Sequence, residues 1–401
     1  MDRRIFGVFL HMNHRPWRGS IKTTTICEEK VIVLESGSKG YIKDMVYYLI
    51  NIMLLTAIWV VAENKKIMLG KKRVIEKNWL FCVIASSNWA ILSGCRHISI
   101  GADTKAYKDM FDMVIKTDLK DIFIMIKERY LYGQRNVKDP GYMLIEKIFQ
   151  EVSVNYQLWL IAIALLFFGA MGMWIYRYSL NPYISYIIFS CLFYSFFAVT
   201  GLRQTIATAL VVMIGTRLIE KKKLIAFLVV VIIAYAIHAS VICFLPFYWL
   251  AKVPINKISL GIYWIVIGSV YLFKQQFLLL LQRVVGYESY QELDGAGAGI
   301  FLYLFLLTAV ITTVFYKYLI DKKNIGIIVN ATMIACIFSS LLLINPSMMR
   351  VVQYYSVFLM LLIPELVNIF KKQKRMIIIL GVSLMCLFLI KNNPQYMFFW
   401  E

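Results

Sequence analysis

The sequence GLRQTIATALVVMIGTRLIEKKKLIAFLVVVIIAYAIHASVICFLPFYWL, residues 201–250, decides the fold. It contains an apolar run that opens at Arg203, a strongly basic cluster at 220–223, and a second apolar run, 224–250, that one histidine, His238, interrupts. Ionisable side chains are costly in lipid and are functional candidates where membrane helices carry them. The stretch therefore predicts two membrane elements joined by a basic turn, with Arg203 and His238 as candidate functional residues.

The composition of the whole chain indicates a membrane protein. Of its 401 residues, 60% are hydrophobic and 16% are charged, and the mean hydropathy is +0.68, which is more apolar than a soluble domain of this length tolerates. The formal net charge is +20. Most of this charge lies between apolar runs, as the positive-inside rule requires, so it does not indicate a nucleic-acid partner.

Metal and cofactor chemistry is not indicated by any motif. The seven cysteines are scattered, without a CxxC pair or a Cys/His cluster, so we expect neither a disulfide framework nor a metal site. A Walker A loop, a dinucleotide fingerprint, a nucleophile elbow and a zincin motif are all absent from the sequence, and no cofactor is predicted.

Apolar runs long enough to approach the thickness of a bilayer recur along the chain. With the run 224–250 they predict an all-α, polytopic integral membrane protein of about 11–12 hydrophobic helices, in a single transmembrane domain over 45–401. The segment 1–44 has eight Lys and Arg and no spanning run; we expect it to be poorly ordered or mis-started, with Met45 as the true initiator. The other runs are 45–62, 78–95, 157–176, 183–200, 203–219, 257–273, 299–320, 325–344, 351–370 and 376–390.

The distribution of charge indicates how the run 224–250 is folded. Six Lys and Arg in the turn 63–77 place that turn in the cytoplasm, and the cluster 220–223 follows on the same side. A single crossing by 224–250 would put every later basic turn outside. A helical hairpin keeps these turns inside and brings its tip, near His238, to the outer face. We therefore expect a hairpin; the alternative is one long helix with a buried histidine.

The same topology places two larger segments outside, at about 96–156 and 274–298. The first has ten Lys and Arg against nine Asp and Glu, which predicts helices at the membrane surface. The second predicts an interfacial helix followed by a flexible, glycine-rich connection.

Apolar spacing and one proline predict two helices within the segment 96–156. Tyr107 and Phe111 share a face of one helix, and Asp139 before Pro140 is typical of the N-cap and first turn of a later helix. We expect an apolar stripe on that later helix. Its members are Ile145, Ile148, Phe149 and Val152.

Ionisable residues gather at the expected outer face. They are Arg96 with its neighbour His97, Arg203, His238 and Arg350. The planar guanidinium suits the oxygens of a diphosphate, whereas each arginine alone could be an interfacial anchor. His238 could donate to a phosphate oxygen or accept the proton of a hydroxyl; its structural alternative is a satisfied core histidine. Asp103 could cap the helix of Tyr107, or act as a base or a sugar-hydroxyl ligand.

These residues lie in motifs whose order resembles the EpsG-type branch of the Wzy-like polysaccharide polymerases. The resemblance runs from around residue 45 to the last helix, and Asp139 stands where glutamate is common in the family. The motifs are Gly101-Ala102-Asp103-Thr104 between Arg96 and Tyr107, Asp139-Pro140-Gly141-Tyr142, Gly201-Leu202-Arg203-Gln204 and His238-Ala239-Ser240.

The resemblance implies a membrane glycosyltransferase that joins polyprenyl-diphosphate-linked oligosaccharide repeat units on the outer face of the bacterial cytoplasmic membrane. It would extend a capsular, exopolysaccharide or O-antigen chain beside membrane lipid, with a flippase and a chain-length regulator as possible partners. On this basis we expect His238 and Asp103 to be catalytic, Arg96, Arg203 and Arg350 to bind the diphosphate, and Gln204 and Tyr107 to contact substrate. A lipid-linked oligosaccharide flippase or other transporter, and an O-antigen-ligase-like transferase, are the alternatives.

Overall fold

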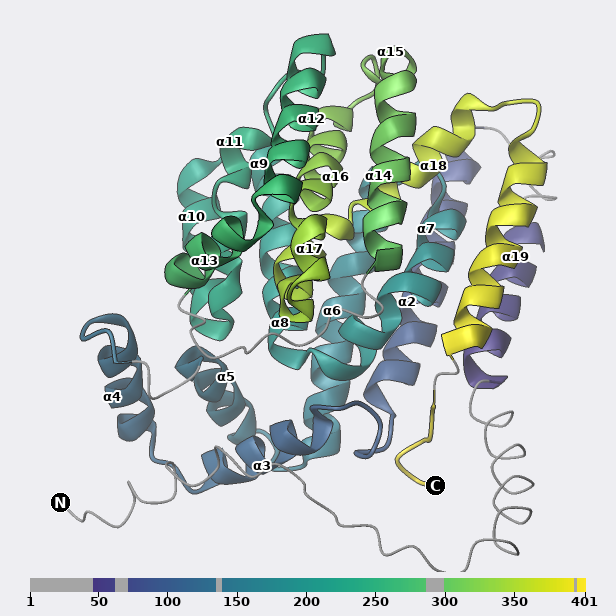
Figure 1. The fold of residues 1–401 in the computed structure, drawn as a ribbon. Helices are drawn as coiled ribbons and strands as arrows, with labels where there is room; N and C mark the ends of the chain where they lie inside the picture. The colour runs from purple at the N-terminus through teal and green to yellow at the C-terminus, as the bar shows by residue number, and fades with distance from the viewer. Residues whose placement is uncertain (1–45, 62–70, 135–138, 286–298, 393–394) are drawn as a thin grey trace, which may run out of the picture. The chain divides into compact units, whose positions relative to one another are not determined.

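The computed structural model describes residues 46–61, 71–134, 139–285, 299–392 and 395–401. Within these ranges the chain forms helices and no strand, apart from an isolated bridge between Arg96 and Phe398 (Figure 1). The prediction of an all-α, polytopic membrane protein is confirmed. Contacts divide the chain into Met1–Lys43 and Asp44–Glu401. The predictions made for residues 1–44 lie outside the described residues. The predicted glycine-rich connection lies mostly within 286–298, which is also outside them.

The apolar helices differ in length. Four described helices are long and apolar enough to cross a bilayer, and the number rises to six if each of two bent pairs is one span. Five more apolar helices have 10–17 residues. The four are Tyr156–Tyr178, Leu202–Glu220, Ile325–Leu343 and Lys374–Asn392; the pairs are Lys257–Leu272 with Lys274–Leu281 and Pro346–Ser356 with Leu359–Ile369.

The first half of the bundle begins with the helix Val46–Val61 and α2 (Lys71–Gly94), which packs along α6 (Tyr156–Tyr178). α7 (Pro182–Ile188) continues into the π-helical segments η1 (Phe189–Phe193) and η2 (Ser195–Thr200). The predicted run 183–200 is therefore helical but locally unwound. Such π-helical segments are rare and often lie at functional sites.

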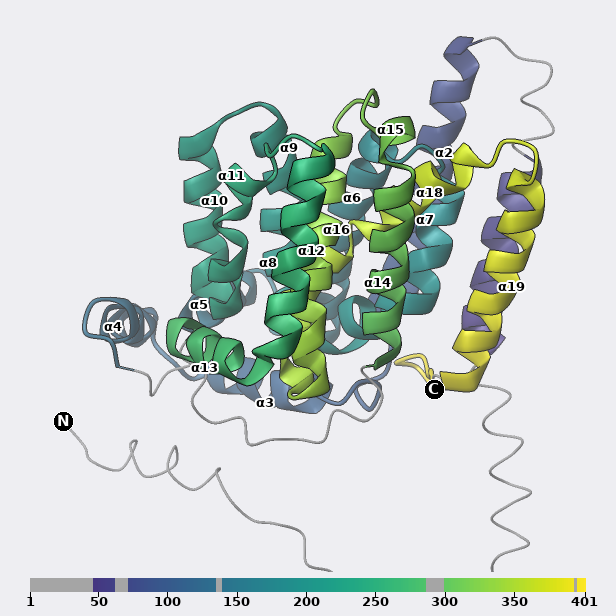
Figure 2. The same cartoon turned by 45° about the horizontal axis from the view of Figure 1, so that its top comes forward.

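The stretch 201–250 forms one long helix and a hairpin. α8 (Leu202–Thr208), the π-helical η3 (Ala209–Ile214) and α9 (Gly215–Glu220) are continuous, and α10 (Leu224–Ile237), η4 (Ala239–Phe244) and α11 (Phe247–Leu250) follow the basic turn. His238 has extended backbone angles, which reverse the chain between α10 and η4. The rings of Phe227 and Tyr248, near the two ends of the hairpin, lie 5.3 Å apart between centroids. The predicted hairpin is confirmed (Figures 1 and 2).

The C-terminal half completes the bundle. α12 (Lys257–Leu272) turns by 91° into α13 (Lys274–Val285), the predicted interfacial helix. α17 (Met349–Ser356) and α18 (Leu359–Ile369) meet at 58°. The run predicted over 351–370 is therefore broken, and Pro364 lies inside α18. The remaining elements are α14 (Gly299–Val314), α15 (Tyr316–Leu319), α16 (Ile325–Ser339), η5 (Ser340–Leu343), η6 (Pro346–Met348) and α19 (Lys374–Asn392).

The basic turns meet at one end of the bundle, which we call the basic end. The carboxylate of Glu220 lies 3.3 Å from Arg177, accepts a 3.2 Å hydrogen bond from Asn324, and lies 3.7 Å from Lys323. The prediction that the turns at 220–223 and 321–323 share one side with Arg177 is confirmed; the turn 63–77 lies partly outside the described residues. The opposite end, which holds α3 (Thr104–Ile115), α5 (Pro140–Gln150) and the tip of the hairpin, we call the loop end (Figure 1).

The loop end contains α3 (Thr104–Ile115), α4 (Leu119–Tyr130) and α5 (Pro140–Gln150). Tyr107 and Phe111 are buried as predicted. The predicted stripe is not the buried face of α5, since Ile148 is 59% exposed and Val152, beyond the end of the helix, is 84% exposed; its contact with the membrane surface stays a prediction. α5 instead turns Gly141, Tyr142, Met143 and Glu146 inward, because it packs against both α3 and α10.

Candidate functional site

The motif Asp139-Pro140-Gly141-Tyr142 joins α5 to the tip of the hairpin. Pro140 supplies the first residue of α5, and the Tyr142 hydroxyl accepts a 3.2 Å hydrogen bond from the Trp159 indole. A Cβ added at Gly141 would lie 2.6 Å from the carbonyl oxygen of Ala236, at the end of α10. Only glycine therefore allows the two backbones to approach this closely.

Asp139 precedes α5 but does not cap it, which corrects the predicted N-cap role. Its φ and ψ are 54° and 56°, in the left-handed region, and its side chain makes no cap hydrogen bond. A non-glycine residue in this conformation costs roughly 1–3 kcal/mol and is commonest at functional sites. The strained backbone turns the carboxylate away from the helix and toward α8 and the hairpin.

The Asp139 carboxylate is the centre of a buried cluster. Its Oδ2 lies 3.0 Å from Nη1 of Arg203 and 3.3 Å from Nδ1 of His238, and its Oδ1 accepts a 3.3 Å hydrogen bond from the backbone N–H of Ala239. The side chains of Asp139, His238 and Arg203 are 3%, 6% and 15% exposed. The structure thus brings together two predicted site residues through a third that was expected to be a cap.

The charge of Asp139 determines how the His238 ring is protonated. Burial by itself would raise the pKa of Asp139, but its hydrogen bond to His238 and the charges of His238 and Arg203 hold the pKa below its ordinary value. An ionised carboxylate only accepts hydrogen bonds, so Nδ1 of His238 carries the proton between them. The buried Nε2 of His238 has no partner within the described part of the chain.

Two further predicted residues support the arginines. The guanidinium of Arg203 lies over the ring of Tyr107, 5.4 Å from its centroid, a distance typical of a cation–π contact. Gln204, which follows Arg203 on α8, donates a 2.5 Å hydrogen bond to the backbone carbonyl of Arg350 on α17. Tyr107 and Gln204 are both buried. Tyr107 therefore positions the side chain of Arg203, and Gln204 positions the backbone of Arg350.

Among the described residues, no hydrogen bond or ion pair joins Arg96 or Asp103 to this cluster. Arg96 is 1% exposed and donates from Nη1 to the carbonyl of Ser93, while its backbone pairs with Phe398. Asp103 is exposed at the start of α3, and its side chain makes no cap hydrogen bond. The predicted side-chain cap is therefore not formed, and the role of Asp103 as a base or a sugar-hydroxyl ligand stays a prediction.

Glu146 is a buried acid that the sequence interpretation missed. It is 0% exposed on α5, one turn after Tyr142, and neither carboxylate oxygen has a hydrogen-bond partner among the residues described. Burial raises its pKa to about 8, and nearby Tyr142 and Arg203 only partly oppose this. Tyr142 and Ile145 predict an apolar face on this helix. A single acid on an apolar face is the sequence signal that could have identified Glu146.

Two carboxyl groups of opposite character therefore lie near Arg203. Asp139 is held ionised by its partners, whereas burial holds Glu146 protonated near neutral pH. Pairs of acids whose surroundings separate their pKa values are typical of acid–base sites. The cluster combines an oriented imidazole, a guanidinium and a fixed negative charge, which suits proton transfer beside an anionic group.

Comparison with known proteins identifies the family. No curated protein and no solved structure matches the chain. A model of the EpsG family matches residues 78–396. This match includes Asp139, Arg203 and His238, together with every helix from α3 to α19. Because the match covers well over half of the sequence, the chain, a multi-pass membrane protein, belongs to the EpsG family.

Proposed function

We propose that the protein is a membrane glycosyltransferase that polymerises polyprenyl-diphosphate-linked oligosaccharide repeat units into an extracellular polysaccharide. Family membership supports a polysaccharide polymerase. The observation that carries the proposal is the buried cluster of Asp139, Arg203 and His238 at the loop end, with Arg350 tied to it through Gln204.

In the proposed reaction a hydroxyl of the incoming repeat unit attacks the anomeric carbon of the growing chain. A new C–O bond forms, and the bond from the anomeric carbon to the diphosphate oxygen breaks with its electron pair. Nε2 of His238 takes the hydroxyl proton, while Asp139 holds Nδ1 and stabilises the positive ring. This assignment favours His238 over Asp103 as the base.

The departing diphosphate carries the negative charge that the site must stabilise. Arg203 and Arg350 are the nearest candidates in this arrangement, since preorganised donors supply a large part of catalysis where charge develops. Arg203 already shares one nitrogen with Asp139, while its buried Nε has no hydrogen-bond partner in the described ranges. Arg203 therefore retains capacity for a phosphate oxygen without giving up its ion pair.

The direction of the charges supports an outward-facing site. Lys322, Lys323 and the cluster 220–223 lie at the basic end, which the positive-inside rule assigns to the cytoplasm. The loop end would then face outside the cytoplasmic membrane, where the substrate diphosphate meets the membrane boundary.

The test uses cells that make a measurable polysaccharide. Arg203→Ala and His238→Ala should insert at normal levels yet abolish long polymer, with single repeat units accumulating on lipid. Arg203→Lys should also fail if the planar fork is needed. Arg217→Ala, an exposed arginine of α9, and His97→Ala are the matched controls and should retain normal chain length.

Different outcomes separate the alternatives. Normal chain length in both Arg203→Ala and His238→Ala would refute the site. Repeat units trapped on the cytoplasmic side would favour a lipid-linked oligosaccharide flippase. Normal polymer that is not transferred to its final acceptor would favour a ligase-like transferase.

A further inference from the structure

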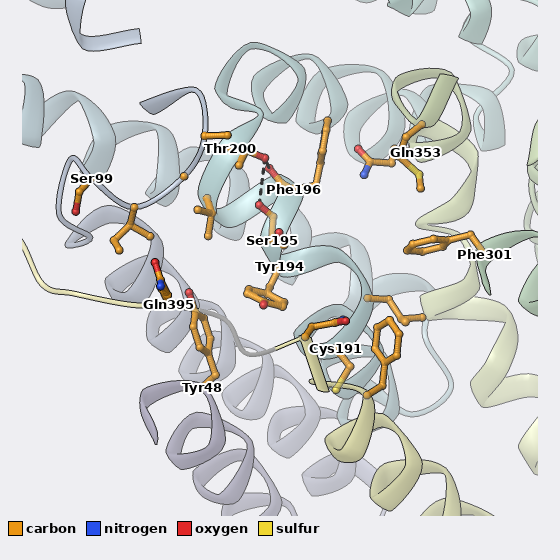
Figure 3. A pocket seen from close by; sticks show the side chains of 18 residues that line it. Tyr48, Ser99, Cys191, Tyr194, Ser195, Phe196, Thr200, Phe301, Gln353 and Gln395 are labelled. Carbon is orange, nitrogen blue, oxygen red and sulfur yellow. Dashed lines mark hydrogen bonds between the residues drawn. The ribbon is translucent and has the colours of Figure 1, made fainter. Parts of the chain in front are cut away.

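We propose that a cavity at the loop end, separate from the cluster of Asp139, Arg203 and His238, binds the uncharged sugar residues of the substrate; this rests on the proposed function and assigns a part of the substrate to a site of its own. The cavity has a volume of about 620 Å³, within the range of about 300–1,000 Å³ typical of ligand sites. Asp139, Arg203 and His238 are not among the described residues that line it. Figure 3 shows the residues around it.

Aromatic rings form a large part of the cavity wall. They come from the first helix, the π-helical segments, α14 and α19, which are far apart in the sequence. Flat rings give an amphipathic partner large contact area together with fixed orientation. The five rings are Tyr48, Tyr194, Phe196, Phe301 and Phe388.

Hydroxyl and amide groups alternate with these rings, and the described lining includes no charged side chain. A diphosphate held here would be desolvated without a counter-charge, which is strongly unfavourable. A polyprenyl tail would cover these hydroxyl and amide groups without offering them hydrogen-bond partners. A neutral, hydroxyl-rich ligand fits both features. The polar residues are Ser99, Ser195, Thr200, Gln353, Asn392 and Gln395.

Gln353 gives the cavity a buried amide oxygen that can accept a hydrogen bond from a ligand. It is 5% exposed, and its Oε1 has no hydrogen-bond partner among the described residues. Figure 3 shows its carboxamide reaching from α17 toward Phe196. A buried, unpaired acceptor is costly unless a ligand or water satisfies it. A sugar hydroxyl is a donor of the required kind.

Residues of the cavity and of the buried cluster are close in sequence at two places. α17 contributes Met349 and Gln353 to the cavity and carries Arg350 between them. Thr200, another lining residue, is followed after two residues by Arg203. One substrate could therefore place its diphosphate at the arginines and its sugars in the cavity. The neutral cavity would select the glycan, and the charged cluster would carry out the reaction.

Binding to the purified full chain tests this assignment, in a detergent without a sugar headgroup. The probe is the repeat-unit oligosaccharide released from its lipid by mild acid, which has neither diphosphate nor lipid. Isothermal titration should show saturable binding. Gln353→Met, which keeps the volume and removes the amide, should raise the Kd about tenfold, or about 1.4 kcal/mol. Gln373→Met, an exposed glutamine in the turn before α19, should leave the Kd unchanged.

Two further variants keep the test decisive. Ser195→Ala changes an exposed hydroxyl in the lining and should raise the Kd about threefold, even if Gln353→Met fails to fold. Arg217→Ala, an exposed arginine that does not line the cavity, should bind the oligosaccharide as the wild type does.

The proposal is overturned if the oligosaccharide does not saturate the wild type, or if Gln353→Met and Ser195→Ala both bind it normally. It is also overturned if polyprenyl phosphate without sugars displaces the oligosaccharide. Lack of polymerisation by the wild type would count against the proposed function alone. Active polymerisation with a KM that Gln353→Met does not change would count against this cavity alone.

Discussion

Each end of the bundle has a carboxylate surrounded by donors, and the two carboxylates differ in burial. At the basic end the side chain of Glu220 is 14% exposed, and its partners Arg177 and Lys323 are 40% and 84% exposed. At the loop end Asp139 is 3% exposed and its partners are 15% or less exposed. Similar ion pairs are therefore exposed to solvent at the basic end and buried at the loop end.

This difference separates a structural contact from a candidate site. Exposed ion pairs contribute about 0–1 kcal/mol to stability, so the contacts of Glu220 hold the turns together but stabilise the fold little. A buried pair is costly to break because the remaining charge is left without solvent or partner. The loop end also has a left-handed Asp139 and unpartnered nitrogens on Arg203 and His238 among the described residues. Of the two clusters, only the one at the loop end combines backbone strain, burial and side-chain nitrogens that have no partner in the described part of the chain.

The largest effect is expected for Asp139→Ala. Removing this carboxylate leaves Arg203 and His238 buried without their shared partner, which should cost about 3 kcal/mol or more of unfolding free energy. Polymer synthesis should be lost as well. The measurements are the apparent Tm of the purified protein in detergent and the polymer length in cells. Wild-type values of both would show that the buried cluster is no more important than the exposed one.

A smaller effect is expected for Gly141→Ala, which tests the packing that forms the loop-end cluster. The added methyl meets the backbone of Ala236, and such overpacking costs about 1–3 kcal/mol. Gly169→Ala is the matched control, since nothing lies within 4 Å of its added Cβ on α6. The control should be neutral or slightly stabilising, because alanine favours a helix. Equal Tm values for the two variants would contradict the close approach.

Glu146→Gln should have an effect that depends on pH. The folded protein keeps Glu146 protonated up to a pH of about 8, whereas the unfolded chain loses that proton near pH 4.5. The unfolded state then binds fewer protons, so wild-type stability should fall as the pH rises through this window. Glutamine mimics the protonated acid, and at pH 7 its polymer yield should stay within about twofold of wild type.

Thermal unfolding of the wild type and Glu146→Gln between pH 5 and 8 checks this prediction. The wild-type apparent Tm should fall more steeply with pH than that of the variant. Parallel curves would show that Glu146 is ionised in the folded protein and has a partner.

The smallest effect is expected for Glu220→Gln at the basic end. It weakens contacts with Arg177 and Lys323 that are largely solvated, and should change the unfolding free energy by less than about 1 kcal/mol. Polymer length should be normal. A loss comparable to that of Asp139→Ala would mean that burial does not distinguish the two ends.

The sequence predicted the helices and the hairpin because both depend on local or summed quantities. Apolar runs set the positions of the membrane helices, and the distribution of Lys and Arg required 224–250 to enter and return. Arg203 and His238 were found because charge in an apolar run is conspicuous. The breaks within 183–200 and 351–370 were missed, since unwinding and bending depend on neighbouring helices.

The sequence by itself thus determined the class of fold, the side shared by the basic turns, and the motifs that indicate the EpsG family. Only the tertiary structure decided what Asp139 does. Before a proline it is typical of a cap, but α5 and the hairpin meet closely at Gly141 and Ala236, and this contact brings its carboxylate to Arg203 and His238. Glu146 and the neutral cavity were decided in the same way. Burial depends on which distant helices pack together, and no local pattern encodes that.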